Sequence, residues 1–518
     1  MNGAQALIRT LVDSGVDVCF TNPGTSEMHF VAALDTVPEM RGVLGLFEGV
    51  VTGAADGYGR MAGRPASTLL HLGPGLGNGM ANLHNARRAS TPVVNVVGDH
   101  ALYHQQYDAP LASDIEAAAG NVSGWYRSST SPAAVGRDAA EAVAAALGPP
   151  GQVATLVLPA DVSWLDGGES AAPVAPVART AVADDVVDEV AKVLRSGEPC
   201  AVLVGGAALR EDGLVAASRV AGATGAKLLG ETFPARLERG AGLPAVERLG
   251  YLAEFTMAQL AGTRHLVLVD ATSPVSFFAY PDKPSDLVPE GCEVHVLAGE
   301  RDDVVGALAA LAEVVGAPAD AATLVPASRS PLPTGPLTAE AVANALGALL
   351  PEGAIVSDEA NTSGLWAPAA TAGAPRHDWL TLCGGAIGQG LPLATGAAVA
   401  CPDRKVVALE ADGSAMYTLQ ALWTQAREGL DVTTVIFNNR SYAILNLELN
   451  RVGAEPPGPK ALDMLDLSRP DLDFVALAAG MGVPATRATT AEELGEQLGR
   501  AVAEPGPALV EAMLPASL

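Results

Sequence analysis

Aromatic and basic residues are both scarce in this sequence. Phe, Trp and Tyr make up 4% of the 518 residues, and 31 Lys and Arg residues stand against 58 Asp and Glu residues, for a formal net charge of −27. Such an acidic surface repels phosphate backbones and anionic lipid headgroups, so nucleic acid and membranes are poor candidates as partners. The excess of acidic residues instead indicates a well-solvated surface.

Cysteine pairs and long apolar runs are missing as well. No stretch of about 18 residues is continuously apolar, as a membrane-spanning helix requires. The cysteines are few, lie far apart and form no C-x-x-C pair, so neither a disulfide framework nor a zinc site is indicated. An odd, scattered set is typical of reduced thiols, and we expect a cytoplasmic protein. The five residues are Cys19, Cys200, Cys292, Cys383 and Cys401.

What the sequence does have is a series of short apolar runs, each followed by a helical pattern. Hydrophobic residues make up 49% of the chain, enough for several packed cores. Two stretches lose this periodicity and gain Pro, Ala and Ser, at 166–185 and 317–336, and we expect them to be linkers. The linkers predict three domains, 1–165, 186–316 and 337–518.

The apolar runs predict parallel sheets. Val- and Leu-rich runs bounded by Gly, Asp or Asn are typical of strands buried on both faces. The runs are PASTLLHL, TPVVNVVGD and VATLVLP in the first domain, PCAVLVGG, RHLVLVD and CEVHVLAG in the second, and GAIVSD, KVVALEAD, VTTVIFNN and PALVEAML in the third. The predicted fold class is α/β, with three open parallel-sheet domains in tandem. Ligands of such sheets bind at the carboxyl ends of strands.

Polar residues follow two strands of the third domain. KVVALEAD ends at Asp412, and VTTVIFNN leads to Asn439 one helix later, so the two side chains can meet at one edge of the sheet. With the carbonyl of Ser441 they would ligate Mg²⁺ and leave positions for phosphate oxygens. Gly413 and Ser414 open the helix and would offer N–H groups and a hydroxyl to a diphosphate. A D-G pair after a strand is by itself a common turn, but the combination is more specific.

The combined pattern resembles the thiamine-diphosphate fingerprint, G-D-G followed by N-N. Together with NPGTSEMHF near the N-terminus and ADGSAMYTLQALWTQAREG, the sequence resembles the acetolactate synthase, pyruvate decarboxylase and benzoylformate decarboxylase family over nearly its whole length, and benzoylformate decarboxylase most. The resemblance implies a pyrimidine-binding, a central and a diphosphate-binding domain, in that order. Ala411 departs from the family's glycine. Its methyl group is tolerable if φ is negative, but it crowds the phosphates.

A carboxylate stands inside the apolar run GVLGLFEGVV. From the residues alone, Glu48 suits either a helix start favoured by the dipole or a functional acid. The resemblance implies the acid, whose carboxyl group bonds N1′ of the aminopyrimidine and so promotes removal of the C2 proton. In the family this glutamate reaches the cofactor from the partner subunit. A homodimer at minimum, and a homotetramer beyond it, is therefore implied.

The resemblance also implies how the cofactor is bent and covered. In LCGGAIGQGLP, the Gly385 carbonyl would accept from the 4′-amino group and Ile387 would lie under the bend. The residues alone favour an ordinary glycine-rich turn there. Tyr442 would lie near the diphosphate.

Further residues are candidates for the substrate pocket. Thr25 matches a small hydroxyl residue that contacts substrate in the family, and His71 matches a histidine used for proton transfer, although a lone His after a strand is more often structural. The weaker candidates follow other strands or cover the site in relatives, and they are His100, His104, Ile444, Asn446 and Glu448. The second histidine of benzoylformate decarboxylase is missing, since Phe278 or Ala279 stands in its place. With the polar 446–448 segment, this favours a small or polar 2-oxo acid such as pyruvate.

The implied function is a thiamine-diphosphate- and Mg²⁺-dependent lyase or transferase, a 2-oxo acid decarboxylase or acetolactate-synthase-like carboligase that works through a C2 ylide and an enamine. The alternatives are an FAD- or NAD-binding oxidoreductase or a non-catalytic paralogue. The loop HLGPGLGNG fails the G-x-G-x-x-G register, because Asn78 takes the last glycine position. FAD in the central domain stays open but is not favoured, because HVLAGERDD lacks the acidic stretch of the FAD-binding acetolactate synthases.

Overall fold

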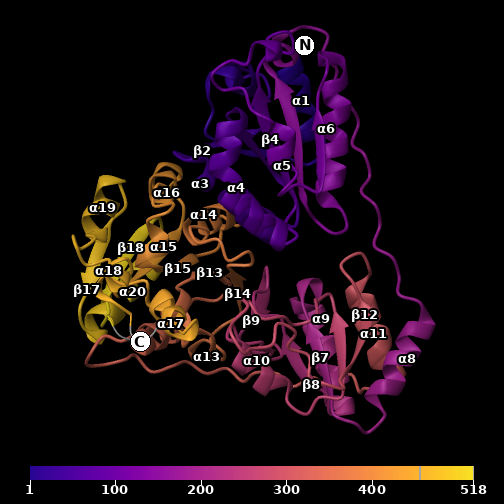
Figure 1. Ribbon diagram of the computed structural model, residues 1–518, viewed down its shortest axis with the longest axis vertical. Coiled ribbons are helices and arrows are strands. Elements are labelled where there is room, and N and C mark those ends of the chain that lie inside the picture. The colour runs from indigo at the N-terminus through magenta and orange to yellow at the C-terminus, as the bar shows by residue number, and fades with distance from the viewer. Residues whose placement is uncertain (454–456, 517–518) are drawn as a thin grey trace.

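Three open sheets form the body of the protein. The computed structural model describes residues 1–453 and 457–516. The N-terminal domain lies at the top of Figure 1, and the central and C-terminal domains lie side by side below it. This confirms the predicted α/β fold with three parallel-dominated sheets. The boundaries drawn at the two linkers stay a prediction.

The N-terminal sheet has six parallel strands in the order β2-β1-β3-β4-β6-β5. One apolar core joins it to α1 and α6, and a second joins it to α3 and α4 on the other face. Its strands are β1 Val18–Thr21, β2 Arg41–Leu44, β3 Ala66–Leu70, β4 Val93–Asp99, β5 Trp125–Ser128 and β6 Val153–Pro159. Its helices are α1 Gly3–Asp13, α2 Met28–Leu34, α3 Glu48–Ala62, α4 Leu72–Arg88, α5 Ile115–Ala119, α6 Pro132–Leu147 and α7 Ala160–Trp164, with 3-10 turns η1 Thr25–Glu27 and η2 Gln105–Tyr107.

The central sheet has five parallel strands in the order β10-β8-β7-β11-β12. These strands are β7 Cys200–Val204, β8 Lys227–Gly230, β10 Glu247–Arg248, β11 His265–Val269 and β12 Glu293–Ala298. The helices around it are α8 Asp184–Leu194, α9 Glu211–Thr224, α10 Ala253–Leu260 and α11 Val304–Val314, and the 3-10 turn η3 Gly206–Leu209 follows β7.

The C-terminal sheet has the order β17-β18-β16-β15-β13-β14-β9. Its last strand, β9 (Leu237–Arg239), comes from the central third of the chain and pairs antiparallel with β14. The other strands are β13 Ala354–Glu359, β14 His377–Thr381, β15 Val406–Ala411, β16 Val432–Asn438, β17 Ala485–Ala488 and β18 Ala508–Met513. The helices are α12 Ala339–Leu349, α13 Ala367–Ala370, α14 Gly390–Ala400, α15 Asp412–Ala415, α16 Ala421–Glu428, α17 Ala443–Arg451, α18 Pro459–Asp463, α19 Phe474–Gly480 and α20 Ala491–Ala503, with the 3-10 turn η4 Asn361–Gly364.

All ten predicted apolar runs form strands, and each sheet adds shorter strands that carry no continuous apolar run. One prediction was wrong. The stretch after Asp412 is not a single helix, because α15 ends at Ala415 and α16 begins only at Ala421. The hydroxyl of Thr418, in the interruption, donates to the carbonyl of Gly388 at 2.9 Å, so the break fastens the glycine-rich loop before α14.

The N- and C-terminal domains meet where α3 packs on α14. A Cβ at Gly57 would lie 2.0 Å from the Leu393 carbonyl oxygen, and a Cβ at Gly396 would lie 1.8 Å from that of Ala54. The two backbones therefore touch, which only glycine allows. Buried apolar residues of both helices belong to one core, so these two domains are packed as one unit.

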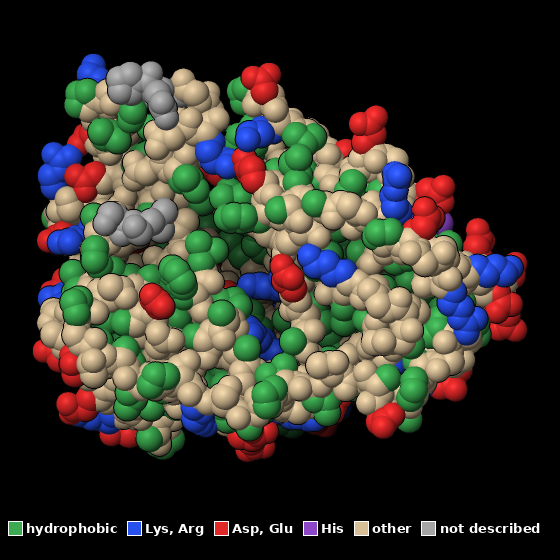
Figure 2. All heavy atoms as spheres, turned by 90° about the horizontal axis from the view of Figure 1, so that it is seen from below, with side chains coloured by type: hydrophobic (Ala, Val, Ile, Leu, Met, Phe, Trp, Pro, Cys, Tyr) green, Lys and Arg blue, Asp and Glu red, His purple; other side chains and the backbone are tan. Residues whose placement is uncertain are grey.

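No helix in the described part of the chain has both the length and the apolar character needed to cross a membrane. Seen from below, the central and C-terminal domains border a hollow that contains hydrophobic and basic side chains (Figure 2). Acidic side chains are spread over the surrounding surface in this view and do not gather into one patch.

Candidate active site

The ends of β15 and β16 bring Asp412 and Asn439 together, as the spacing predicted. Oδ1 of Asp412 accepts from the N–H of Gly413 at 2.8 Å, and Oδ2 accepts from the N–H of Arg440 at 2.6 Å. Arg440 has a φ of +59°, a value that L residues rarely adopt, and this turns the chain back toward Asp412. Oδ1 of Asn439 accepts from the N–H of Ser441 at 3.0 Å.

The other predicted phosphate-side residues surround this pair. Gly413 and Ser414 form the first turn of α15, and the ring of Tyr442 lies on Gly413, where a Cβ would be only 2.4 Å from its Cε1. The hydroxyl of Ser441 accepts from the amide of Asn446 at 3.0 Å. The structure thus brings the C-terminal candidates into one cluster.

The cluster has the chemistry that a divalent cation needs. Asp412 is 2% exposed, and burial raises the pKa of its carboxyl group while the surrounding main-chain N–H groups lower it. A buried carboxylate beside amide, hydroxyl and carbonyl oxygens is a ligand set suited to Mg²⁺. Ala411 has a φ of −74°, so the methyl group causes no backbone strain.

Glu48 is the first residue of α3 and is buried. Its Oε2 accepts from the amide of Asn78 at 3.0 Å. Gly75 makes room for the carboxylate, since a Cβ there would lie 3.1 Å from Oε1. The HLGPGLGNG segment forms the start of α4, and its glycine at position 75 lets the helix lie close to Glu48.

His71 lies at the N-cap of α4 and is paired with a glutamate that the sequence analysis missed. Its Nδ1 is 2.8 Å from Oε2 of Glu27, a residue that is 2% exposed. The same oxygen accepts from the N–H of Gly24 at 2.8 Å, so Glu27 acts as acceptor and Nδ1 as donor. Thr25 is exposed in the same 3-10 turn as Glu27. The sequence feature that could have pointed to Glu27 is the spacing G-x-x-E, which is typical of a capping turn.

The loop before α14 is held by the N-terminal domain. Gly385 has a φ of +72° and is exposed, as a carbonyl that accepts from a ligand would be, and Ile387 is half-buried. Two asparagines of α4 bind the loop: Asn82 donates to the Gly388 carbonyl at 3.1 Å, and Asn85 donates to the Ala386 carbonyl at 2.8 Å.

The central domain contributes an aromatic cluster that the sequence analysis did not foresee. The ring of Phe277 packs on Gly385, where a Cβ would lie 2.7 Å from its Cζ. Phe277 in turn contacts three other rings, those of Phe233, Tyr251 and Phe278. These rings fill space beside the loop that would hold the cofactor.

The remaining pocket candidates are more scattered. Glu448 is hydrogen-bonded to the central domain, where the hydroxyl of Tyr280 donates to its Oε2 at 2.6 Å. Ile444 lies half-buried on α17. His100 and His104 lie beyond β4 with ring centroids 5.4 Å apart, and His104 is exposed. The pocket roles of these four residues stay predictions.

Comparisons with known proteins agree with this geometry. The "Thiamine pyrophosphate enzyme, N-terminal TPP binding domain" profile matches residues 1–135, and the "Thiamine pyrophosphate enzyme, C-terminal TPP binding domain" profile matches residues 361–512. The chain is 66% identical over 516 residues, 99% of each chain, to IlvX of Mycobacterium tuberculosis, named provisionally as an acetolactate synthase large subunit. The chain belongs to the thiamine pyrophosphate enzyme family.

Two decarboxylases are among the similar proteins. The benzoylformate decarboxylase of Pseudomonas aeruginosa is 30% identical, with 96% of each chain covered. The structure of the Rhodococcus jostii RHA1 thiamine diphosphate-dependent 4-hydroxybenzoylformate decarboxylase superposes with a TM-score of 0.85 at 25% identity, with 99% of each chain covered. This thiamine pyrophosphate (thiamine diphosphate) enzyme is therefore a member of the acetolactate synthase and benzoylformate decarboxylase group.

The central domain of this thiamine pyrophosphate enzyme ends β7 in a glycine pair, as nucleotide-binding domains do. Here the domain's own carboxylates take the N–H groups of the turn. Gly206 donates to Oε1 of Glu231 at 3.1 Å, and Ala207 donates to Oδ2 of Asp270 at 2.8 Å. A Cβ at Gly206 would lie 2.2 Å from the same Asp270 oxygen. Two acidic groups thus occupy the N–H donors that a phosphate at this turn would use.

Proposed function

We propose that this enzyme decarboxylates a 2-oxo acid with thiamine diphosphate and Mg²⁺, and that it protonates the product carbon or adds it to a second carbonyl compound. The observation that carries the proposal is a hydrogen bond between two neighbouring turns. Asp412, after β15, accepts from the main-chain N–H of Arg440, after β16. Asp412, Asn439 and the carbonyl of Ser441 would hold the cation. Gly413 and Ser414 would face the diphosphate.

Glu48 and the loop before α14 would hold the other end of the cofactor. When bound, thiamine diphosphate would supply a nucleophilic thiazolium carbon and a ring that accepts the electron pair left behind as CO₂ departs. The carboxyl group of Glu48 would hold a proton at N1′ of the aminopyrimidine, and Asn78 fixes that carboxyl group by donating to Oε2. The Gly385 carbonyl would accept from the 4′-amino group, with Ile387 beneath the bend.

His71 is the group we propose to transfer a proton at the substrate. Because Nδ1 donates to Glu27, Nε2 is the nitrogen left for substrate or product. Thr25, exposed in the same turn as Glu27, would contact the substrate carboxylate. A proton donor at this position favours release of an aldehyde over addition to a second carbonyl.

The aromatic cluster supports a small or polar substrate such as pyruvate. Phe277 packs on Gly385 and on three other rings, and a substrate ring beside this loop would have to share the space with them. The central turn filled by Glu231 and Asp270 supports the absence of FAD from the holoenzyme.

The test is product analysis with purified enzyme, Mg²⁺ and thiamine diphosphate. Pyruvate, 2-oxobutyrate and benzoylformate are supplied in turn, and aldehyde and acetohydroxy acid are measured together. We expect turnover of pyruvate to exceed that of benzoylformate, with aldehyde as the main product. Preference for benzoylformate would contradict the substrate proposal, and turnover without added Mg²⁺ and cofactor in stripped enzyme would contradict the whole proposal.

We further propose that the active unit is a homodimer, with tetramers formed from dimers, in which Glu48 of one subunit serves Asp412 of the other. Co-expression of Glu48→Gln and Asp412→Ala chains tests this arrangement. In a mixed dimer one of the two sites is then fully wild type, so about a quarter of all sites should regain activity although each variant alone is inactive. No recovery in verified mixed dimers would place both residues in one chain's site.

A further inference from the structure

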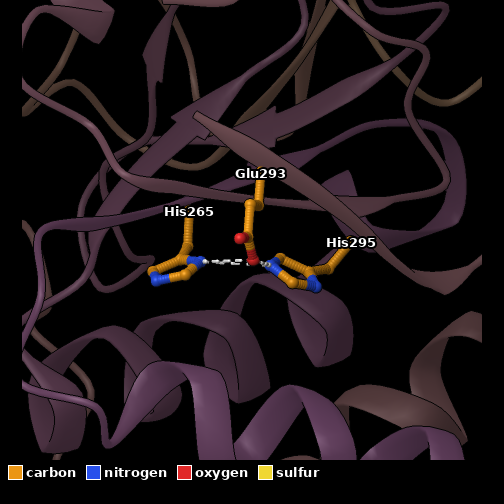
Figure 3. A group of neighbouring side chains, drawn as sticks. All are labelled: His265, Glu293 and His295. Atoms are coloured by element: carbon orange, nitrogen blue, oxygen red, sulfur yellow. Dashed lines mark hydrogen bonds and ion pairs between the residues drawn. The ribbon is translucent and has the colours of Figure 1, made fainter. Parts of the chain in front are cut away.

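Two histidines and a glutamate converge on the central domain, at the end of the sheet opposite the turn after β7. His265 is the first residue of β11, Glu293 is the first residue of β12, and the two are register partners. His295 follows two residues later on β12 and so lies on the same face. Figure 3 shows the three side chains pointing toward one another.

The distances between their ligand atoms suit one shared ion. Nδ1 of His265 lies 3.2 Å from Nε2 of His295, and these atoms lie 3.7 and 3.9 Å from Oε2 of Glu293. Tetrahedral ligands at zinc bond lengths are about 3.3–3.4 Å apart, whereas neighbouring octahedral ligands are only about 3.0 Å apart. The three atoms are spaced as a tetrahedral site requires, after a shift of a few tenths of an ångström by the exposed Glu293 side chain.

A second carboxylate orients the more buried histidine. Nε2 of His265 lies 3.0 Å from Oε2 of Glu198, in the segment before β7. With Nε2–H donating to Glu198, the lone pair of Nδ1 points toward His295 and Glu293. A carboxylate that fixes the outer nitrogen of a histidine is the arrangement that accompanies metal-ligating histidines.

From this geometry we propose that the central domain binds a divalent cation of the zinc class through His265, Glu293 and His295, with Glu198 as positioning residue. Imidazole nitrogens favour Zn²⁺, Co²⁺ or Ni²⁺ over Mg²⁺, so the site selects a different ion from the diphosphate site. The three ligands come from two strands and leave one tetrahedral position for water. The ion would join the edge strand β12 to β11 and, through Glu198, to the start of β7.

The neighbouring thiol is not part of the ligand set. Cys200 is the register partner of His265 on the other side, but its Sγ is directed at the main-chain carbonyls of Val193 and Glu198. Burial also raises the pKa of the Cys200 thiol, which disfavours the thiolate that a metal would need.

Metal titration of the untagged holoenzyme tests the proposal. The protein is stripped with chelator, reloaded with excess Mg²⁺ and thiamine diphosphate, and titrated with Zn²⁺ by calorimetry and with Co²⁺ by visible absorption. We expect one ion per chain and the intense visible bands of a tetrahedral Co²⁺ site, which an octahedral oxygen site does not give. We also expect Zn²⁺ to raise the unfolding temperature, because it binds only the folded chain.

Variants assign the binding to these residues. His295→Gln and Glu293→Gln should abolish the Co²⁺ bands and the thermal shift, and Glu198→Gln should weaken binding by about 10- to 100-fold. His29→Gln, a change at an exposed histidine of α2, is the matched control and should bind as wild type does. Glu293 is exposed, so its variant tests the site without risk to folding. Binding weaker than roughly 0.1 mM, or equal binding by His295→Gln, would show a hydrogen-bonded cluster only.

Discussion

The turns after β15 and after β7 have the same topology but differ in the number of acidic side chains that they bind. Each follows a buried parallel strand and opens a helical turn through a glycine. After β15 a single acid, Asp412, is surrounded by amide and hydroxyl groups. After β7 two acids, Glu231 and Asp270, converge on the N–H groups of the turn itself.

This difference explains why one fold can present a ligand site in one domain and a closed structural turn in another. A lone buried carboxylate among neutral oxygens is completed by a cation, and the cation then attracts phosphate. Two acidic side chains already occupy the N–H groups of the turn, so a phosphate group would find no free donor there. Strand topology predicts where a ligand site can lie, and the number of acids at the turn decides whether a ligand can bind there.

The largest effect is expected for a change at Glu48 that stops proton transfer and leaves cofactor binding at the β15 turn intact. Glu48→Gln should lower turnover by about 100- to 10 000-fold because the amide cannot hold the N1′ proton as a carboxyl group does. Thiamine diphosphate should still bind, since Asp412 and its neighbours are intact, and calorimetry measures this. The control is Glu39→Gln, a surface change in the same domain. Full activity of Glu48→Gln would remove Glu48 from its proposed role.

The next effect concerns the β15 turn itself. Asp412→Asn keeps the shape of the side chain but removes the charge that a cation requires, so the Kd for thiamine diphosphate in Mg²⁺ should rise by at least about 100-fold, more than outer-shell changes cost. Asp403→Asn, at an exposed position between α14 and β15, should leave the Kd unchanged. An unchanged Kd for Asp412→Asn would mean that the diphosphate is held elsewhere.

A smaller effect is expected at the β7 turn, and it depends on pH. Burial raises the pKa of Glu231 from 4.5 to about 7. Glu231 therefore holds its proton in the folded chain at pH values where it has lost it in the unfolded chain, so its contribution to stability is fully present below pH 4.5 and is lost as the pH rises through about 7. Glu231→Gln keeps the bond to Gly206 and should remove this loss, about 3 kcal/mol.

Urea unfolding at pH 5 and pH 8 measures this loss in wild type and variant at fixed Mg²⁺ and cofactor. Glu189→Gln, at an exposed position of α8, serves as the control and should retain the wild-type pH dependence. Equal pH dependence of wild type and Glu231→Gln would show that Glu231 does not store a proton at the β7 turn.

The smallest effect is expected at Ala411. Because φ is −74° there, the turn does not need the glycine that other family members have, and Ala411→Gly should change the cofactor Kd by less than about threefold. A large gain in affinity would show that the methyl group does crowd the phosphates. The same calorimetric titration used for Asp412→Asn gives this value.

Local sequence features predicted much of this architecture. Continuous Val- and Leu-rich runs identified the strands buried on both faces, and the residues that follow β15 and β16 predicted that Asp412 and Asn439 lie at one edge of the sheet. Their success is physical, because both features depend only on a strand and the turn after it. Asp412 and Asn439 needed no knowledge of distant contacts beyond the parallel topology.

Features that depend on long-range register could not be predicted in this way. Asn78 stood out only as the residue that broke a glycine pattern, although it holds Glu48. The interruption of the helix after α15 depends on the bond from Thr418 to Gly388, which no local periodicity encodes. Likewise, His265 and His295 meet only because β11 and β12 are neighbours in one particular register.

The segment 234–239 belongs to the central third of the chain but is bound to both of the other domains. Its strand β9 completes the C-terminal sheet, the carbonyl of Pro234 accepts from Thr381, and the carbonyl of Ala235 accepts from Arg60 of the N-terminal domain. A shortened enzyme built by excising the central domain at its linkers would bare the edge of β14 and leave a buried guanidinium short of an acceptor. Chimaeras should therefore carry this segment with the catalytic pair of domains and exchange only what lies around it.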